Sequence, residues 1–201
     1  NFPGMDKSHP FSTLWAFHLH HHGKQWCVAG RFATIPLQES TIPLESLGLD
    51  PDKAYHVFDF WEQSYLGCIS HSFTGKPLEL GCCQILAFYQ AMPHPQLIGS
   101  TRHVSMDAVS VLEEVWEELA DTLDRPERLR RKGCLRMSFQ CIPGAEEAYT
   151  IVLPEGYARP ALQYTGAACS LEQKGSLLIL AVKGEEQKAD VQIYFQEEQE
   201  P

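Results

Sequence analysis

Four histidines stand close together near the start of the chain, at positions 18, 20, 21 and 22. If this stretch is a β-strand, His18, His20 and His22 share one face at a spacing of about 7 Å. Three imidazoles on one face could bind a zinc or copper ion. Same-face residues of a strand diverge, however, and a zinc site normally draws ligands from other segments too. The cluster therefore predicts either a metal site or, as the favoured interpretation, a polar face.

Asp59 lies among aromatic neighbours, in the run Phe58-Asp59-Phe60-Trp61. Burial among such rings disfavours the ionised carboxylate and would suit it to general acid catalysis. Glycoside hydrolysis would need a second carboxylate roughly 5 to 10 Å away, and Glu62 is a conceivable partner. Nothing in the spacing demands this pair, so we expect a structural Asp59 that is hydrogen-bonded to a neighbouring loop.

Trp61, Arg102 and His103 are the residues whose chemistry would suit a carbohydrate. An exposed tryptophan can stack on a sugar ring, and an Arg–His pair can bind an anion or a sugar hydroxyl. Each also has a structural alternative. All four tryptophans lie in apolar, strand-like runs that favour core packing. An Arg–His pair at a strand end more often caps a loop or pairs with an acidic neighbour.

No fingerprint of a known catalytic centre occurs in the chain. A Gly-rich phosphate loop, a Walker sequence, a GxSxG elbow and an HExxH motif are all missing, and we predict no cofactor. The seven cysteines include no CxxC pair, so a zinc ribbon or a thioredoxin-type site is unsupported. We expect buried free thiols. An odd count in a chain of this size favours a reducing compartment such as the cytoplasm.

Composition limits the classes of partner. The chain has 201 residues, a 44% hydrophobic content and a net charge of −10, which allows one large or two small domains with a core. The acidic balance, without a basic stripe, argues against nucleic acid. No apolar run approaches the roughly 20 residues that cross a bilayer, so no membrane partner is predicted. The first residue is Asn rather than Met, and we expect a fragment of a longer protein.

The stretch from residue 55 to 67 organises the predicted fold. It is dense in aromatic and β-branched residues and favours a strand, and a polar break at 62–64 allows residues 65–69 to return as a second strand. Apolar residues fall on both faces, as in an inner strand covered on two sides. Further strands are predicted over 12–22, 25–35, 78–90 and 96–104, with a loop holding one helical turn over 36–51.

Beyond about residue 105 the pattern changes. Residues 109–123 fit both a helical stripe and a strand alternation, and 121–132 form a charged surface connection. Many short strands with regular turns favour sandwiches. We therefore predict an all-β fold of two antiparallel β-sandwich units, residues 9–104 and 105–198. The strands predicted in the second unit are 134–142, 148–153, 176–183 and 189–196.

Short motifs follow one another through the first half of the chain in an order that resembles a known family. The motifs are Asp6–Pro10, Leu14–Ala16, Lys24–Phe32, Leu47–Leu49, Tyr55–Trp61, Tyr65–Gly67 and His94–His103. In this order they resemble the region after the catalytic barrel in alpha-galactosidase-like and related glycoside hydrolases, and the resemblance covers residues 6–104. Residues 153–157 are similar to a further β-rich tail of some members.

The resemblance implies an antiparallel β-sandwich that follows a (β/α)₈ barrel. Catalytic aspartates of such enzymes lie at barrel strand ends, and this chain has no alternating strand–helix pattern, so no catalytic residue is carried over and the fragment is not expected to be an enzyme. The implied function is that of a non-catalytic C-terminal accessory region in carbohydrate metabolism, with the barrel of its parent chain as partner. The alternatives are an autonomous carbohydrate-binding module, which requires an exposed aromatic platform, and a metal-binding protein centred on the histidines.

Overall fold

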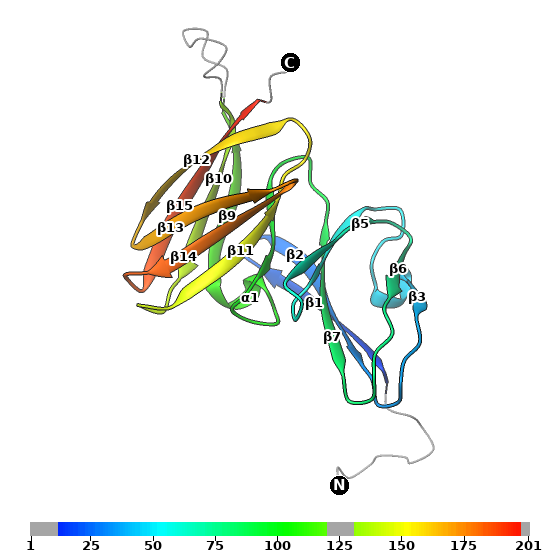
Figure 1. Cartoon of the computed structure of the whole chain (residues 1–201). Helices are drawn as coiled ribbons and strands as arrows, with labels where there is room; N and C mark the ends of the chain where they lie inside the picture. Colours follow the sequence, from blue (N-terminus) through cyan, green and yellow to red (C-terminus); the bar gives the residue numbers. More distant parts are fainter. Residues whose placement is uncertain (1–11, 120–130, 198–201) are drawn as a thin grey trace.

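The computed structural model describes residues 12–119 and 131–197 of the chain. Within them, nearly all regular structure is antiparallel β-strand in four sheets, and the helices η1 (Leu44–Leu47) and α1 (Asp107–Ser110) have four residues each. The predicted all-β, sandwich-like fold class is therefore confirmed. Figure 1 shows two lobes, which we call the first unit (residues 12–90) and the second unit (residues 96–119 and 131–197).

The first unit is built around a five-stranded sheet whose order differs from the chain order. Across the sheet, the strands are β1 (Leu14–His21), β2 (Lys24–Phe32), β7 (Cys83–Gln90), β4 (Tyr55–Asp59) and β5 (Ser64–Ile69). Every residue of β4 is buried, because this strand has neighbours on both sides and both faces of the sheet are covered there. The predicted hairpin with an inner first strand is thus confirmed.

A small two-stranded sheet covers one face of the five-stranded sheet. β3 (Ser40–Pro43) pairs with β6 (Ser72–Gly75), and η1 follows β3 directly. Ile42, Leu44 and Phe73 from these elements share an apolar core with residues of β2, β4 and β7. The helical turn predicted within residues 36–51 is present. β3 and β6 were not predicted, because four residues are too few for a clear alternation.

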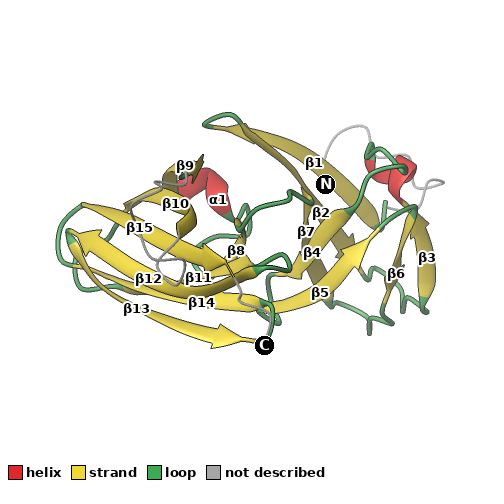
Figure 2. Cartoon of the chain, turned by 90° about the horizontal axis from the view of Figure 1, so that it is seen from above, coloured by secondary structure: helices red, strands yellow, loops and turns green. Residues whose placement is uncertain are grey.

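The second unit is a sandwich of two four-stranded sheets, seen as two layers in Figure 2. One sheet has the order β12 (Tyr157–Thr165), β15 (Lys188–Glu197), β10 (Arg131–Gln140) and β9 (Val111–Glu118). The other has the order β13 (Ala167–Lys174), β14 (Leu177–Gly184), β11 (Glu146–Val152) and β8 (Gln96–Ser100). Val191, Ile193 and Phe195 alternate along β15 and are fully buried between the layers, as a sandwich requires.

The four strands predicted in the second half are present as β10, β11, β14 and β15. The ambiguous residues 109–123 hold the strand β9, whose pairing with β10 favours the extended form. β12 and β13 were not predicted. They are the edge strands of their sheets and expose many side chains, so their hydrophobic pattern is weak. Of the predicted charged connection over 121–132, residues 121–130 lie outside the described residues.

β8 precedes the predicted unit boundary at residues 104 and 105, yet it pairs with β11 of the second unit. The chain leaves the five-stranded sheet at Gln90 and enters the sandwich at Gln96. Pro93 and Pro95 occupy the short link between these two strands. Proline cannot donate to a strand ladder, so the link belongs to neither sheet.

The two units pack against each other through a third apolar cluster. Trp26 and Tyr89 of the first unit and Ile98 and Met106 of the second are all buried in it. The Trp26 and Tyr89 rings are stacked with their centroids 5.9 Å apart, and the Trp26 indole N–H donates to the Ser105 carbonyl oxygen at 3.1 Å. The junction is therefore a packed interface.

The seven cysteines are thiols and form no disulfide bond in the described part of the chain. Cys27, Cys134 and Cys141 are buried, as predicted, but Cys68 and Cys82 are exposed, so the prediction of buried thiols is right only in part. Burial raises the pKa of the Cys27 thiol to about 11. A thiol that stays protonated at neutral pH is a poor nucleophile, so Cys27 behaves as a small apolar side chain.

Candidate functional site

A cleft of about 570 Å³ opens where the two units meet, and we call it the junction cleft. Its walls come from the ends of β1, β2 and β7, from the link before β8, and from β9. The Trp116 ring stacks on the His94 ring, with centroids 5.3 Å apart and planes 2° apart. The polar and aromatic residues that line the cleft are His22, Lys24, Gln25, Gln90, His94, Gln96, Glu114 and Trp116.

Lys24, the first residue of β2, reaches from the first unit into the second. Its ammonium donates to the Leu97 carbonyl oxygen at 2.6 Å and to Asp107 Oδ2 at 2.7 Å, and it forms a further ion pair with Glu114. The ammonium also lies over the Tyr89 ring, 4.6 Å from its centroid. Glu114 accepts a hydrogen bond from the Leu97 N–H at 2.9 Å. One largely buried cation is thus shared by carboxylates from α1 and β9.

This network holds one ammonium and two carboxylates, so it carries one net negative charge when all three are ionised. Burial raises the pKa of Asp107 to about 6, against the attraction of Lys24 and with the help of the Glu114 charge. Burial of Lys24 opposes its charge, but the two carboxylates outweigh burial and leave its pKa raised. Below about pH 6, the network therefore prefers to hold an extra proton on Asp107.

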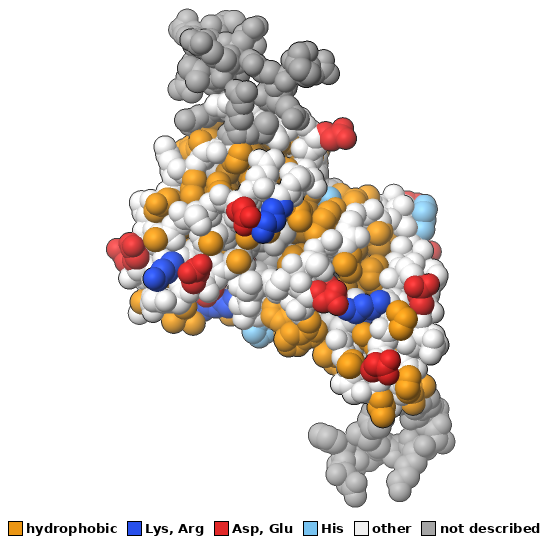
Figure 3. Space-filling model, in the orientation of Figure 1, with side chains coloured by type: hydrophobic (Ala, Val, Ile, Leu, Met, Phe, Trp, Pro, Cys, Tyr) orange, Lys and Arg blue, Asp and Glu red, His pale blue; other side chains and the backbone are white. Residues whose placement is uncertain are grey.

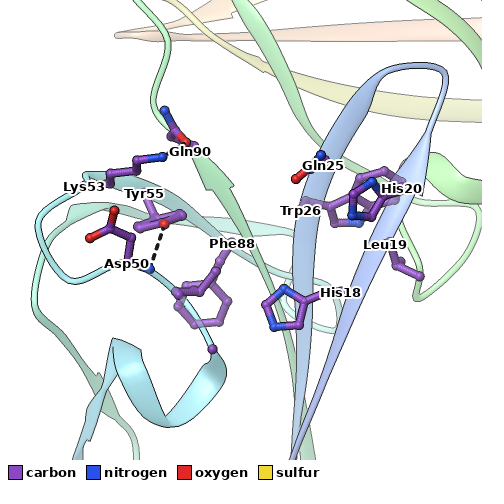
Figure 4. Close-up of a pocket in the computed structure, with 12 residues that line it drawn as sticks. His18, Leu19, His20, Gln25, Trp26, Asp50, Lys53, Tyr55, Phe88 and Gln90 are labelled. Atoms are coloured by element: carbon purple, nitrogen blue, oxygen red, sulfur yellow. Dashed lines mark hydrogen bonds between the residues drawn. The ribbon is translucent and has the colours of Figure 1, made fainter.

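A smaller pocket of about 230 Å³ lies within the first unit, and we call it the β1 pocket. Figure 4 shows its two walls, with Asp50 and Lys53 from the segment before β4 on one side and His18 and His20 of β1 on the other. Phe88 of β7 lies between these walls. The pocket thus combines an aromatic surface with a polar rim.

Two of the three predicted metal ligands, His18 and His20, line the β1 pocket, while His22 lines the junction cleft. β1 ends at His21, and His22 turns away with a φ of 46°, so the expected alignment of all three on one strand face is wrong. Nε2 of His18 is hydrogen-bonded to the Leu47 carbonyl oxygen at 2.8 Å. Across residues 12–119 and 131–197, no group of three or more His, Cys, Asp or Glu could hold a metal ion.

The residues predicted to contact carbohydrate lie outside both pockets. Arg102 donates to Glu147 Oε1 at 2.9 Å and also to the Gln140 carbonyl oxygen. His103 Nδ1 accepts from the Ser105 N–H at 3.1 Å. These bonds match the structural alternatives, an acidic pairing for Arg102 and a loop contact for His103.

The tryptophans divide into two pairs. Trp26 is 3% exposed and Trp116 is partly buried, in agreement with the predicted core packing. Trp15 and Trp61 are 51% and 58% exposed, so that prediction is wrong for them. Trp61 follows β4 at a turn, and Trp15 points away from the covered face of an edge strand. Strand-like sequence alone cannot tell which face of an edge strand remains uncovered.

Asp59 has the structural role expected of it. Its side chain is 1% exposed. Oδ1 accepts hydrogen bonds from the backbone N–H groups of Trp61 and Glu62, at 3.1 and 3.2 Å, and Oδ2 accepts one from the Gln84 amide at 2.9 Å. Lys76 Nζ lies 3.9 Å from Oδ2. The carboxylate thus fixes the turn between β4 and β5.

An aromatic face covers the outer part of β1 and β2. Trp15, Phe17 and Phe32 lie on the same side of the sheet and are 51%, 59% and 39% exposed. The Phe32 ring occupies the space beside Gly30, where a Cβ atom would come within 2.6 Å of the ring and 3.4 Å of Ile85. Figure 3 shows groups of hydrophobic side chains over the lobe that holds the first unit. We call Trp15, Phe17 and Phe32 the β1–β2 aromatic face.

The pocket residues that sequence reasoning missed are Lys24, Gln25, Gln90, Glu114 and Trp116. Lys24 lies between the strands predicted over 12–22 and 25–35, and no local pattern connects it with Glu114, which lies 90 residues further along the chain. A signal exists only at Trp116, where an aromatic residue stands among glutamates. The pairing of β8 with β11 decides which residues face the cleft, and short-range periodicity does not encode that pairing.

Fold and pockets together define a two-unit, all-β protein with one cleft at the junction of its units and a second, smaller pocket within the first unit. No protein-family model matches the chain, and no curated protein is found to be similar to it. The resemblance to glycoside hydrolases therefore stays a prediction. Within the described ranges, neither of the short helices could span a lipid bilayer.

Proposed function

We propose that this chain is a non-catalytic accessory β-sandwich region of a glycoside-hydrolase-like protein that acts in carbohydrate metabolism. Its partner in this proposal is the catalytic barrel of the same parent chain. The observation that carries the proposal is the β1–β2 aromatic face. Three neighbouring aromatic side chains with large exposed fractions mark a surface that is suited to burial against another folded domain.

The position of this face fits the proposed partner. In the enzymes that the chain resembles, the sandwich follows the barrel, so a barrel would be connected ahead of β1. Trp15 and Phe17 lie in the first half of that strand. A domain connected there is held near the aromatic face, which raises its effective concentration. Apolar burial, at about 25 cal/mol per Å², would then stabilise the packed state.

The proposal is tested on the purified chain with nitrophenyl glycosides and with the hydrophobic dye anilinonaphthalene sulfonate. We expect no turnover, and a dye fluorescence that falls in the double variant Trp15→Ser/Phe17→Ser. The matched control is Trp61→Ser, because Trp61 is equally exposed but follows β4, near the opposite edge of the sheet. Its dye fluorescence should stay at the wild-type value. Turnover that survives repurification, or no response to the double variant, would overturn the proposal.

A carbohydrate-binding module is the second candidate, because two tryptophans are exposed where such a module needs an aromatic platform. Pyranose rings stack on flat aromatic faces through their C–H groups, while their hydroxyls bond to polar neighbours. This candidate predicts saturable saccharide binding without turnover. Isothermal titration with neutral oligosaccharides separates it from a purely packing role, for which no binding is expected.

A further inference from the structure

The junction cleft and the β1 pocket are neighbours that meet at two amide side chains. Gln25 and Gln90 line both of them. Cys27 of β2 pairs with Phe88 of β7 in antiparallel register, so two residues further on Gln25 comes opposite Gln90 at one end of the five-stranded sheet. A ligand that occupies both cavities would therefore lie over this end of the five-stranded sheet, next to the side-chain amides of Gln25 and Gln90.

The rim of the paired pockets offers hydrogen-bonding groups that the protein itself leaves unused. His20, His22 and Gln25 are exposed, and their side chains make no hydrogen bond within the described part of the chain. Gln90 accepts a bond from Lys53 at 3.2 Å through Oε1, which leaves its amide N–H groups for a ligand. Amides and imidazoles both donate and accept, which matches the dual character of a hydroxyl group.

The paired pockets hold no excess of positive charge. The β1 pocket holds the cation Lys53 and the anion Asp50, and the junction cleft holds Lys24 and Glu114. Lys24 is already paired with two carboxylates, since Asp107 lies 2.7 Å from its ammonium. In the junction cleft, a phosphate or carboxylate ligand would find Lys24 already paired. In the β1 pocket, Lys53 donates to Gln90 Oε1 and shares the pocket with the carboxylate of Asp50. The ligand that fits is neutral and rich in hydroxyl groups.

Aromatic side chains supply the apolar part of each pocket. Tyr55 and Phe88 line the β1 pocket, as Figure 4 shows, but are only 6% and 1% exposed, and the partly buried Trp116 lines the junction cleft. A mostly buried apolar wall behind a polar rim suits a ligand whose hydroxyls bond to the rim and whose C–H groups meet the small apolar area that stays accessible. A sugar ring has this distribution.

The wall between the pockets is fixed before any ligand binds. The Gln96 amide donates to the Gln90 carbonyl oxygen at 3.2 Å and accepts from the Met92 N–H at 2.9 Å. Lys24 holds the neighbouring wall through its network with the second unit. Binding to a prepared site costs less ordering of the protein, so modest contacts suffice for measurable affinity.

We propose that the paired pockets bind one neutral oligosaccharide of at least two sugar rings across the end of the five-stranded sheet, with Gln25 and Gln90 bonded to it at the crossing point. This inference rests on the carbohydrate-binding candidate function and deepens it. It assigns the site to the paired pockets and excludes the exposed Trp15 and Trp61.

The test is isothermal titration of the purified chain with three trisaccharides: a neutral galacto-oligosaccharide, maltotriose and trigalacturonic acid. We expect at least one neutral trisaccharide to bind with a stoichiometry of one, more tightly than its monosaccharide, and the acidic trisaccharide to bind more weakly. A stoichiometry of two, or preference for the acidic probe, would overturn the single neutral ligand.

Variants locate the site. Gln25→Ala and Gln90→Ala should each weaken the binding of the preferred trisaccharide by about 2- to 12-fold, the loss expected for one neutral hydrogen bond. Both glutamines are exposed, so circular dichroism should show an unchanged fold. The matched control is Gln163→Ala, an equally exposed glutamine on β12, which should bind like the wild type.

The measurements distinguish a failure of the proposed paired-pocket site from a failure of the carbohydrate-binding function. If Trp15→Ala or Trp61→Ala abolishes binding while both glutamine variants keep it, the carbohydrate-binding function stands and the paired-pocket site is overturned. If no saccharide binds at all, both the site and the carbohydrate-binding candidate fail. The accessory role would still be decided by the dye and turnover measurements, which do not depend on sugar binding.

Discussion

The interior of the second unit and the junction between the units are both buried, but they differ in chemistry. Between the two sheets of the second unit, apolar side chains such as Phe139, Ile151 and Leu180 fill the space. At the junction, an apolar cluster stands beside the ammonium of Lys24 and its two carboxylates. The interior of the second unit is stabilised by the hydrophobic effect, which does not depend on the relative direction of the packed groups. The junction adds hydrogen bonds and ion pairs, which form only when donor and acceptor are suitably oriented.

The comparison indicates that the main role of the Lys24 network is to orient the two units relative to each other, and not to add to the stability of the fold. A buried ion network can often be replaced by apolar side chains of similar volume without loss, so burial alone could hold the units together. The acceptors of Lys24 come from β8, α1 and β9, three separate elements of the second unit. We infer that the network sets the angle between the units and thereby the shape of the junction cleft.

The largest effect is expected when the network loses its cation. Lys24→Met leaves two buried carboxylates without a counter-ion and should lower the free energy of unfolding by about 3–5 kcal/mol at pH 7. Urea unfolding measures this loss. The control is Lys53→Met. The exposed Lys53 ammonium donates to Gln90, and its loss should lower the free energy of unfolding by less than about 0.5 kcal/mol. Equal losses of unfolding free energy in Lys24→Met and Lys53→Met would contradict a special role of the Lys24 network at the junction.

The next effect concerns the apolar interior. Leu180→Ala removes a side chain that is fully buried between the sheets and should cost about 2–5 kcal/mol, by lost burial and by the cavity left behind. No titrating group takes part, so the loss should be equal at pH 5 and pH 7. Urea unfolding at both pH values checks this. A loss that changed with pH would show that the two regions are coupled.

A smaller effect, with a distinctive pH dependence, is expected from Asp107→Asn. The pKa of Asp107 is about 6 in the folded chain and about 3.9 in an unfolded one, so between these values the folded state binds the proton more tightly. The stability contributed by Asp107 therefore falls as pH rises. Relative to wild type, the Asn variant should gain on the order of 2 kcal/mol between pH 4 and pH 7. A constant difference in unfolding free energy would contradict this.

The smallest effect is expected outside both regions. Trp61 is largely exposed and its ring meets Phe60 edge-on, with centroids 5.0 Å apart. Trp61→Ala should change the unfolding free energy by less than about 0.5 kcal/mol, because little buried contact is lost. This variant gives the baseline for the other three. A loss above about 1 kcal/mol would mean that the exposed ring supports the β4–β5 turn.

The fold could be predicted where the hydrophobic pattern of a strand indicates which of its faces are buried. β4 is apolar on both faces because both are covered, and β15 alternates because one face meets a core. β12 and β13 escaped prediction because edge strands with exposed side chains lose that periodicity. The assignment of β8 to the second unit depends on its partner β11, about 50 residues away, and no local pattern carries that information.

The candidate site was predicted less well than the fold. Of the histidine cluster, His18 and His20 line the β1 pocket. The turn that moves His22 into the other cavity depends on one backbone angle. Lys24 was not predicted as a site residue, because its bonds to Leu97, Asp107 and Glu114 form only after the two units have met. Contacts between residues of different units leave no pattern within either segment, so they cannot be predicted from local sequence.

The sequence separations within the Lys24 network bear on the order of folding events. Lys24 bonds to residues 73, 83 and 90 positions further along the chain, whereas β13 and β14 are consecutive strands of a hairpin. Closing long loops costs more entropy, and distant contacts tend to form late. Bonds that are missing from the transition state act on the rate of unfolding and hardly on the rate of folding. The network therefore governs the lifetime of the assembled molecule, while the hairpins govern how fast it forms.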